Sequence, residues 1–352
     1  MLIENQRWFS LRIGKPQKKR RVVPFTLLVL VIAALSALIW TWSFLNSPAE
    51  EPGREVLITI PSGSSFVSAS QLLVDEGVIR SLKGFVLLGK IKGLSNSIQA
   101  GELMFRTDMT PGEALDVLVR GKAVSYHVTI PEGYNIRMIS ALLAEKGLVK
   151  EDRFRTLAMD SEFSRRLGIP SDTLEGFLFP DTYSWPKGLS EEEILKRMTT
   201  KYKSVFTETM RSRAQQMGMT ELEVVTLASI IEKETGAPEE RELVSAVFHN
   251  RLKKGYRLQT DPTVIYGLKD FDGNLTKKDL RTDHPFNTYT RSGLPVGPIA
   301  NPGEASLKAA LNPAKVSYLY FVARGDGTHV FSNTLVEHNK AVAIYQLGEV
   351  PR

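Results

Sequence analysis

Two glutamates end a stretch of sequence that is otherwise almost entirely apolar, LASIIEKETG at residues 227–236. Glu232 and Glu234 are separated by a single lysine. A carboxyl group serves as a general acid or base when its surroundings bring its pKa close to the working pH. The first chemistry that this sequence indicates is therefore proton transfer by a glutamate.

A helix must position these carboxyl groups. Thr220 and Glu223 form a capping-box pattern, and Gly236 suits the position just beyond a helix end, which predicts a helix from about 221 to 235. Glu232 then lies in the last turn. The partial negative charge of that helix end and the apolar neighbours would both favour a protonated carboxyl group, as a general acid requires.

The two glutamates are not expected to be equivalent. Ala228 and Ser229 precede Glu232 by one turn and would leave room for a substrate, whereas isoleucines precede Glu234. Glu234 is therefore predicted to be solvated or salt-bridged. The alternative for both is an ordinary solvated helix terminus.

Four polar residues further along the chain are candidates for substrate binding: Gln259, Asp261, Asn287 and Tyr289. Gln259 and Asp261 precede Pro262, in a segment expected to form a loop. Asp261 is either a second carboxylate, as a hydrolase would need, or a turn residue. Without further information, Tyr289 reads better as a core tyrosine with a satisfied hydroxyl group.

Several long motifs closely resemble the membrane-anchored endolytic murein transglycosylases, the MltG or YceG-like family. They occur in the family's order: LEGFLFPDTY (174–183), LASIIEKETG (227–236), NRLKKGYRLQTDPTVIYG (250–267), FNTYTRSGLPVGPIANPG (286–303) and SLKAALNPAKVSYLYFV (306–322). The resemblance as a whole covers nearly everything after residue 49. The resemblance implies that Glu232 is the catalytic glutamate and that Tyr289 lies in the active site. It also implies a LysM-like module at residues 56–125.

The reaction implied by the resemblance is a lyase reaction on peptidoglycan. The β-1,4 bond between N-acetylmuramic acid and N-acetylglucosamine is cleaved without water, and the muramyl C6 hydroxyl closes a 1,6-anhydro ring. One carboxyl group can act first as acid and then as base. The implied role is termination of glycan elongation beside peptidoglycan synthases and penicillin-binding proteins. The alternatives are an inactive peptidoglycan-binding scaffold and a muramidase-type hydrolase.

An internal repeat indicates how the chain is organised. Residues 59–79 and 129–149 share eight of 21 positions, and each copy reads as a strand, a turn and a helix closed by Gly77 or Gly147. We therefore expect an α+β fold with a duplicated βα unit. The C-terminal part predicts a β-hairpin followed by a helix over about 334–346.

The N-terminal region predicts a membrane anchor. Residues 1–49 hold seven Lys or Arg and one acid, and no charged residue lies between Val22 and Ala49. This apolar run is long enough to span a bilayer and too long for a cleaved signal peptide, which is the alternative. The positive-inside rule places the N-terminus in the cytoplasm and the rest of the chain outside the inner membrane, in the periplasm.

The predicted division of the chain follows from these features: a cytoplasmic basic tail (1–21), a transmembrane helix (22–46), a linker (47–55), the LysM-like module (56–125) and a catalytic domain (126–352).

The remaining composition argues against several other classes of protein. Beyond residue 49 the acidic and basic residues balance, so a nucleic-acid partner is not expected. The chain has no cysteine, and its five histidines show no metal-binding spacing. We therefore expect neither a metal nor another cofactor.

Overall fold

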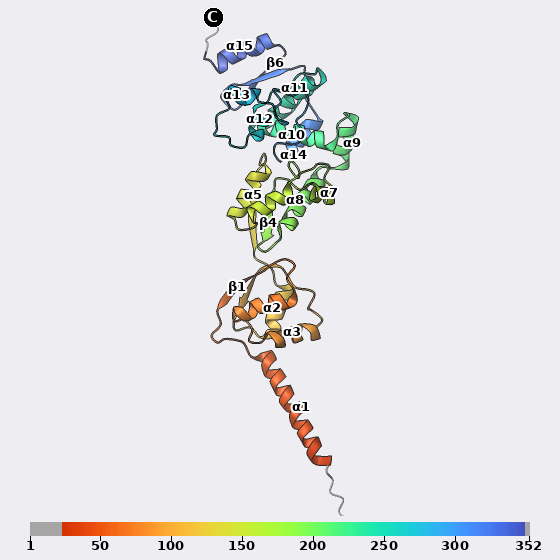
Figure 1. The fold of residues 1–352 in the computed structure, drawn as a ribbon, viewed down its shortest axis with the longest axis vertical. Coiled ribbons are helices and arrows are strands. Elements are labelled where there is room, and N and C mark those ends of the chain that lie inside the picture. The colour runs from red at the N-terminus through yellow and green to blue at the C-terminus, as the bar shows by residue number, and fades with distance from the viewer. Residues whose placement is uncertain (1–22, 349–352) are drawn as a thin grey trace, which may run out of the picture.

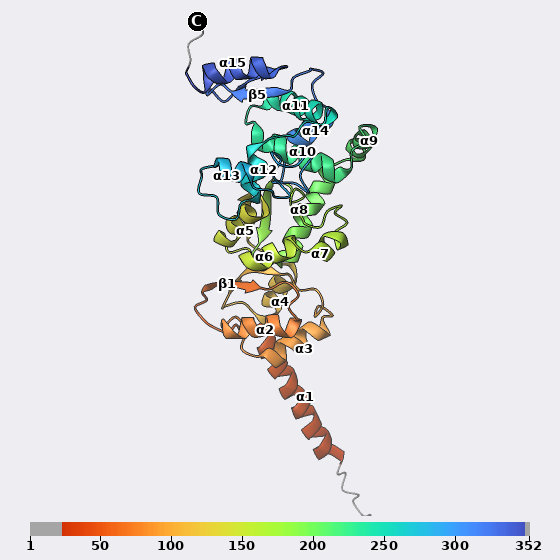
Figure 2. The ribbon, with the colours of Figure 1, turned by 45° about the horizontal axis from the view of Figure 1, so that its top comes forward.

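The computed structural model describes residues 23–348, which form three parts in a row along the long axis of the molecule. A single long helix leads into a small unit, and a larger body follows (Figure 1). A second view, turned by 45°, keeps this order (Figure 2). The predicted basic tail, residues 1–21, lies outside the described residues, as do Val22 and residues 349–352.

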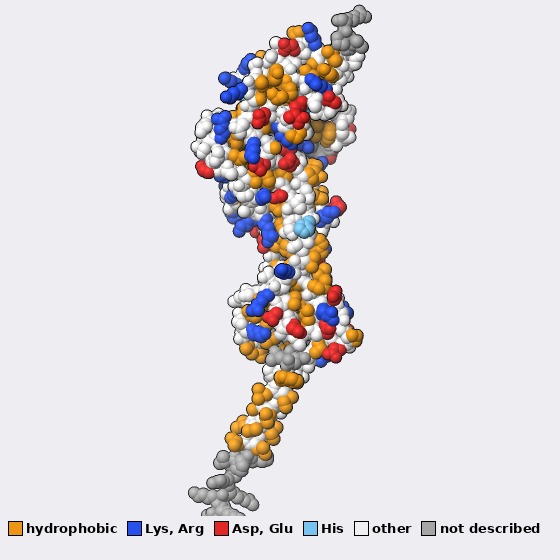
Figure 3. Space-filling model, turned by 180° about the vertical axis from the view of Figure 1, so that it is seen from behind, with side chains coloured by type: hydrophobic (Ala, Val, Ile, Leu, Met, Phe, Trp, Pro, Cys, Tyr) orange, Lys and Arg blue, Asp and Glu red, His pale blue; other side chains and the backbone are white. Residues whose placement is uncertain are grey.

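Helix α1 (Val23–Asn46) is the part that fits a membrane. Its window Leu27–Phe44 has a mean hydropathy of 2.2, and none of it is buried against the rest of the protein. In Figure 3 hydrophobic side chains cover most of the part of this helix that is drawn in colour. Among the described residues it is the one helix long and apolar enough to cross a bilayer. The predicted span 22–46 corresponds to α1, apart from Val22.

The small unit has its own hydrophobic core. Its elements are β1 (Glu55–Ile60), α2 (Phe66–Asp75), α3 (Leu82–Ile91), β2 (Gly101–Arg106) and α4 (Pro111–Arg120). The two strands pair antiparallel from Glu55 opposite Arg106 to Ile60 opposite Gly101. Alternate residues of β1 point into a core that draws on residues 56–119. A capping box of Thr110 and Glu113 begins α4.

The larger body has a second, separate core drawn from residues 128–311. Its first half contains β3 (Ser125–Thr129), α5 (Ile136–Glu145), α6 (Glu151–Ala158), α7 (Ser161–Arg166), β4 (Thr182–Pro186), α8 (Glu191–Val205) and α9 (Glu208–Gln216). Its second half contains α10 (Glu221–Glu234), a short 3-10 turn (Pro238–Glu240), α11 (Arg241–Lys253), α12 (Asp261–Gly267), α13 (Lys277–Arg281), α14 (Glu304–Leu311), β5 (Tyr320–Ala323), β6 (His329–Ser332) and α15 (Leu335–Tyr345). Strands β3 and β4 pair antiparallel, as do β5 and β6. The mixture of helices and strands confirms the predicted α+β class.

The predicted repeat and C-terminal hairpin are both present. Strand β1 with α2 and strand β3 with α5 are the two copies, and Gly77 and Gly147 follow their helices with φ of 74° and 66°. Such left-handed angles suit glycine, as the helix-end signal required. The hairpin β5–β6 is followed by α15, capped by Thr334.

Helix α10 lies at the centre of the second core. The capping box of Thr220 and Glu223 begins it, as predicted, and residues 224–231 are all buried. It packs against α11, α12 and α14. The helix ends because Thr235 is extended, with φ −136° and ψ 132°. Glu232 is therefore in the last turn, as expected.

Candidate active site

Three consecutive charged residues at the end of α10 point in three different directions. Successive helical residues are rotated by about 100°, so Glu232 and Glu234 face roughly opposite sides. Glu232 faces Gly303 and Arg241, Lys233 approaches the carbonyl oxygen of Gly133 at 3.5 Å, and Glu234 faces Thr260. One helix end thus contributes to two separate environments.

The carboxylate of Glu232 is held by two partners. The backbone N–H of Gly303 donates to its Oε2 at 2.9 Å, and Nη2 of Arg241 lies 3.8 Å from its Oε1. Only 6% of the Glu232 side chain is exposed. An amide donor and a guanidinium group are partners that bind a negatively charged oxygen.

The space predicted beside Glu232 is not open. Ser229 is fully buried, and its hydroxyl oxygen accepts a hydrogen bond at 3.0 Å from the backbone N–H of Ile299. The loop 293–303 therefore covers the small residues that were expected to leave room for a substrate. The prediction of an open space there was wrong, because a loop 70 positions away in the sequence fills it.

A second glutamate, Glu132, shares the surroundings of Glu232. It lies in the turn of the second repeat copy and is exposed. A Cβ added at Gly303 would lie 1.8 Å from Oε1 of Glu132, so this carboxyl group rests directly on the glycine. Partial burial and the charge of Glu232 raise the pKa of Glu132, and Arg241 partly offsets them. Two carboxyl groups thus flank Gly303.

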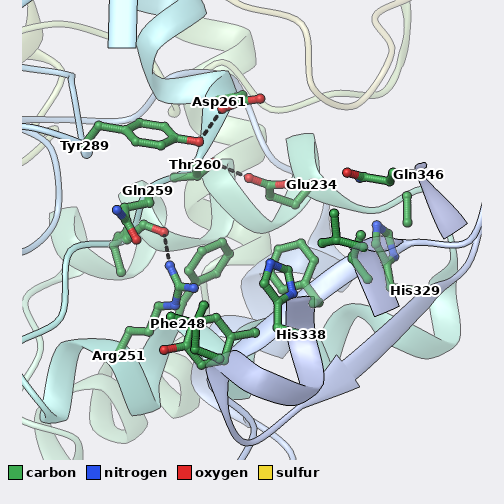
Figure 4. A pocket seen from close by; sticks show the side chains of 17 residues that line it. Glu234, Phe248, Arg251, Gln259, Thr260, Asp261, Tyr289, His329, His338 and Gln346 are labelled. Carbon is green, nitrogen blue, oxygen red and sulfur yellow. Dashed lines mark hydrogen bonds between the residues drawn. The ribbon is translucent and has the colours of Figure 1, made fainter. Parts of the chain in front are cut away.

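Glu234 lies in a pocket on the other side of α10. The pocket has a volume of about 530 Å³ and is walled by α10, α11, the hairpin β5–β6 and α15 (Figure 4). The Thr260 hydroxyl donates a hydrogen bond to Glu234, and burial raises the pKa of that carboxyl group. The prediction of a solvated or salt-bridged Glu234 was wrong, because residues 258–261 fold over it.

Three of the four predicted substrate-binding residues line this same pocket: Gln259, Asp261 and Tyr289. The Tyr289 hydroxyl donates to Oδ1 of Asp261 at 2.5 Å (Figure 4). Asp261 is the first residue of α12 and not part of a loop. Gln259 has φ of 51°, the one left-handed non-glycine residue within 23–348. Such strain is often found at functional sites.

Asn287 is placed differently from the other three. It is buried, and its Nδ2 lies 2.8–3.2 Å from three carbonyl oxygens at the end of α13, those of Asp279, Leu280 and Thr282. Its Oδ1 accepts from the backbone N–H of Tyr289 at 2.8 Å. The amide is thus fully used within the protein, and its contact positions Tyr289.

A buried glutamate connects the loop 293–303 to the second repeat copy. The carboxyl group of Glu175 accepts hydrogen bonds from the backbone N–H of Ile136, from Tyr266 Oη at 3.0 Å and from Asn301 Nδ2 at 3.1 Å. Burial raises its pKa to about 7. Asn301 in turn binds the carbonyl oxygen of Tyr134 at 2.8 Å.

Sequence reasoning overlooked Glu132, Glu175 and Arg241. Two signals in the sequence could have indicated them. Glu175 lies within one of the quoted motifs, and Glu132 differs from Ser62 at the matching position of the repeat.

Within residues 23–348 no three His, Asp or Glu side chains gather in a way that could hold a metal ion.

A family model and several known proteins are similar to this chain over most of its length. The YceG-like family matches residues 58–344 of the chain. A protein of Bacillus subtilis named endolytic murein transglycosylase is 35% identical over 325 residues, which cover 88% of this chain and 90% of that protein. A protein of the same name from Streptococcus pneumoniae is 27% identical, and the match covers 82% of this chain and 58% of that longer protein.

A solved structure is similar as well. The crystal structure of a YceG-like protein from Listeria monocytogenes superposes with a TM-score of 0.57 and 34% sequence identity. The match covers 82% of this chain and 99% of the Listeria chain.

Proposed function

Because this chain belongs to the YceG-like family, we propose that it is an endolytic murein transglycosylase, as its relatives in Bacillus subtilis and Streptococcus pneumoniae are named. Its substrate is then the glycan of peptidoglycan, cut within the strand. The observation that supports a catalytic role for a particular residue is the position of Glu232. It lies in the last turn of α10, in contact with Gly303 and Arg241.

Glu232 is the proposed general acid and base. The bond that breaks joins C1 of N-acetylmuramic acid to O4 of N-acetylglucosamine, and the bond that forms joins C1 to the muramyl O6. A proton leaves O6 and a proton reaches O4, so the products are a 1,6-anhydro end and a free hydroxyl group, without water. The Gly303 N–H and Arg241 support the carboxylate stage of this cycle.

The pocket beside Glu234 is proposed to hold the continuing glycan strand. Gln259, Asp261 and Tyr289 present an amide, a carboxylate and a hydroxyl group there, which suit sugar hydroxyl and N-acetyl groups. A glycan strand is long enough to pass from this pocket across the end of one helix to Glu232. Asn287 contributes by fixing the backbone of Tyr289.

The placement in the cell is also part of the proposal. Helix α1 anchors the chain in the inner membrane, with the basic N-terminal tail in the cytoplasm and the catalytic domain (126–352) in the periplasm. Residues 56–125 would serve as a LysM-like module beyond a short linker. An enzyme tethered in this way can cut nascent strands beside the peptidoglycan synthases and so end their elongation.

One experiment tests the activity and its product together. Full-length protein in detergent is incubated with purified sacculi, and the released muropeptides are analysed by mass spectrometry. A lytic transglycosylase gives anhydro ends, which are one water lighter than the reducing ends of a muramidase. The muramidase alternative is worth testing because Glu132 and Glu232 both lie against Gly303, and retaining and inverting hydrolases use two carboxyl groups.

Matched variants test the assignment of Glu232. We expect Glu232→Gln to lower product release by about 10²–10⁴-fold, the usual contribution of acid–base catalysis. Glu234→Gln, two residues along the same helix, should affect substrate affinity more than turnover. If Glu234→Gln abolishes turnover and Glu232→Gln does not, the roles are reversed. If wild type and both variants bind sacculi but release nothing, the protein is a scaffold.

A further inference from the structure

The two repeat copies share a turn but differ at one residue in it. The turns read TIPSG at 59–63 and TIPEG at 129–133, and the final glycines have nearly the same φ, 77° and 76°. Ser62 therefore occupies the position that Glu132 occupies in the second copy. Since serine supports the same turn, the local fold does not require a glutamate at residue 132.

The second turn differs from the first in what it contacts. A Cβ added at Gly133 would lie 3.6 Å from Cγ of Glu232 and 3.5 Å from Cδ of Lys233, so this turn packs on the end of α10. The Glu132 side chain continues over Gly303, whose N–H binds Glu232. The one copy that reaches α10 is thus the copy that carries a glutamate.

The two carboxyl groups in this centre are held differently. Glu232 is almost covered and is bound to an N–H and a guanidinium group. Within residues 23–348 no hydrogen bond or ion pair holds the carboxyl group of Glu132, which is exposed. The charged groups around Glu132 are Glu232 and Lys233 on α10 and Arg241 on α11. Partial burial and, after it, the nearby charge of Glu232 raise the pKa of Glu132 and so favour a proton on it.

We propose that Glu132 is a second catalytic carboxyl group, which gives its proton to the leaving oxygen while Glu232 receives the proton of the attacking hydroxyl group. This inference rests on the proposed function and divides between two residues the roles assigned there to one. The C1–O4 bond breaks as O4 takes the proton of Glu132. The C1–O6 bond forms as the O6 proton passes to Glu232. Transfer of that proton from Glu232 to Glu132 restores the starting state.

The test uses the full-length enzyme with two substrates and three variants. Glu132→Gln removes the proton and keeps the shape, and Glu132→Ser installs the residue of the first copy, which the turn accepts. Glu145→Gln removes an exposed carboxylate from the same repeat copy as a control. We expect both Glu132 variants to cleave glycan strands at least about 10²-fold more slowly than wild type, with unchanged melting temperature, and the control to stay within about twofold.

The second substrate separates proton donation from positioning. It is a muramyl oligosaccharide that ends in a para-nitrophenyl leaving group, which departs without a proton. We expect this substrate to restore Glu132→Gln to within about tenfold of wild type and not to restore Glu232→Gln. Full activity of both Glu132 variants on glycan would overturn the inference and leave the proposed function intact. Equal losses on both substrates would also overturn it, because Glu132 would then only position the loop.

Discussion

The buried Glu175 makes the stability of the larger body depend on pH in a direction that can be calculated. Its pKa is about 7 in the folded protein, compared with an ordinary value of 4.5. Between these values the unfolded chain is ionised while the folded protein keeps the proton. Folding therefore binds a proton, and stability falls as pH rises through this window. Below about 4.5 the contribution is complete, and above about 7 it is lost.

The size of this effect follows from the same two values. One pKa unit corresponds to about 1.4 kcal/mol, so the rise in the pKa of Glu175 costs about 3 kcal/mol once the group is ionised in the folded protein. Glu175→Gln cannot ionise and retains one oxygen acceptor for Ile136 N–H, Asn301 or Tyr266. Its stability should be lower than that of wild type at pH 5 and should lack this contribution to the pH dependence.

The assay is urea unfolding of full-length protein in detergent at a series of pH values between 5 and 8. Trp185 is buried in the same core as Glu175 and reports on its unfolding. Glu132 and Glu234 have raised pKa values and titrate in the same direction, so the difference between wild type and Glu175→Gln is the quantity that counts. A difference that stays constant from pH 5 to 8 would refute the reasoning.

Three further variants test the contacts around the proposed site. Gly303→Ala would place a methyl group 1.8 Å from Oε1 of Glu132, and we expect it to lower glycan cleavage at least about tenfold. The control is Gly297→Ala, whose Cβ would meet nothing within 4 Å and whose activity should stay close to that of wild type. Arg241→Gln breaks the buried ion pair with Glu232, and we expect a loss of about 3 kcal/mol in urea unfolding; wild-type stability of this variant would mean that Arg241 and Glu232 do not form a buried ion pair. Tyr289→Phe loses one hydrogen bond at the pocket rim and should cost about 1 kcal/mol or less in stability while raising KM in sacculus digestion; an unchanged KM would remove this residue from the substrate site.

The parts of the fold that could be predicted are those with local signals. Thr220 with Glu223 marked the start of α10, because a capping box satisfies backbone donors within four residues. Gly77 and Gly147 marked helix ends, because a left-handed angle at that position favours glycine. These signals depend on contacts between residues that are close in the sequence, so they do not depend on the tertiary structure.

The parts of the site that could not be predicted depend on distant segments. The space beside Ser229 is filled by Ile299, and the side chain of Glu234 is covered by Thr260. Neither contact could be predicted from the spacing of the residues in and around α10. The helix spacing did predict that Glu232 and Glu234 differ, but only the tertiary contacts determine which one meets a pocket and which one meets Arg241.

The repeat shows how the same local fold can make different tertiary contacts in its two copies. In the first copy the backbone N–H of Ser62 binds the carbonyl oxygen of Gly188, and in the second the N–H of Gly133 binds that of Asn301. Both turns therefore dock onto loops of the larger body, and the difference lies in which loop they meet. The loop that contains Asn301 also brings Gly303 to Glu232. A carboxyl group at residue 132 consequently lies beside the proposed catalytic glutamate, whereas a glutamate at residue 62 would lie beside Glu193, away from that site.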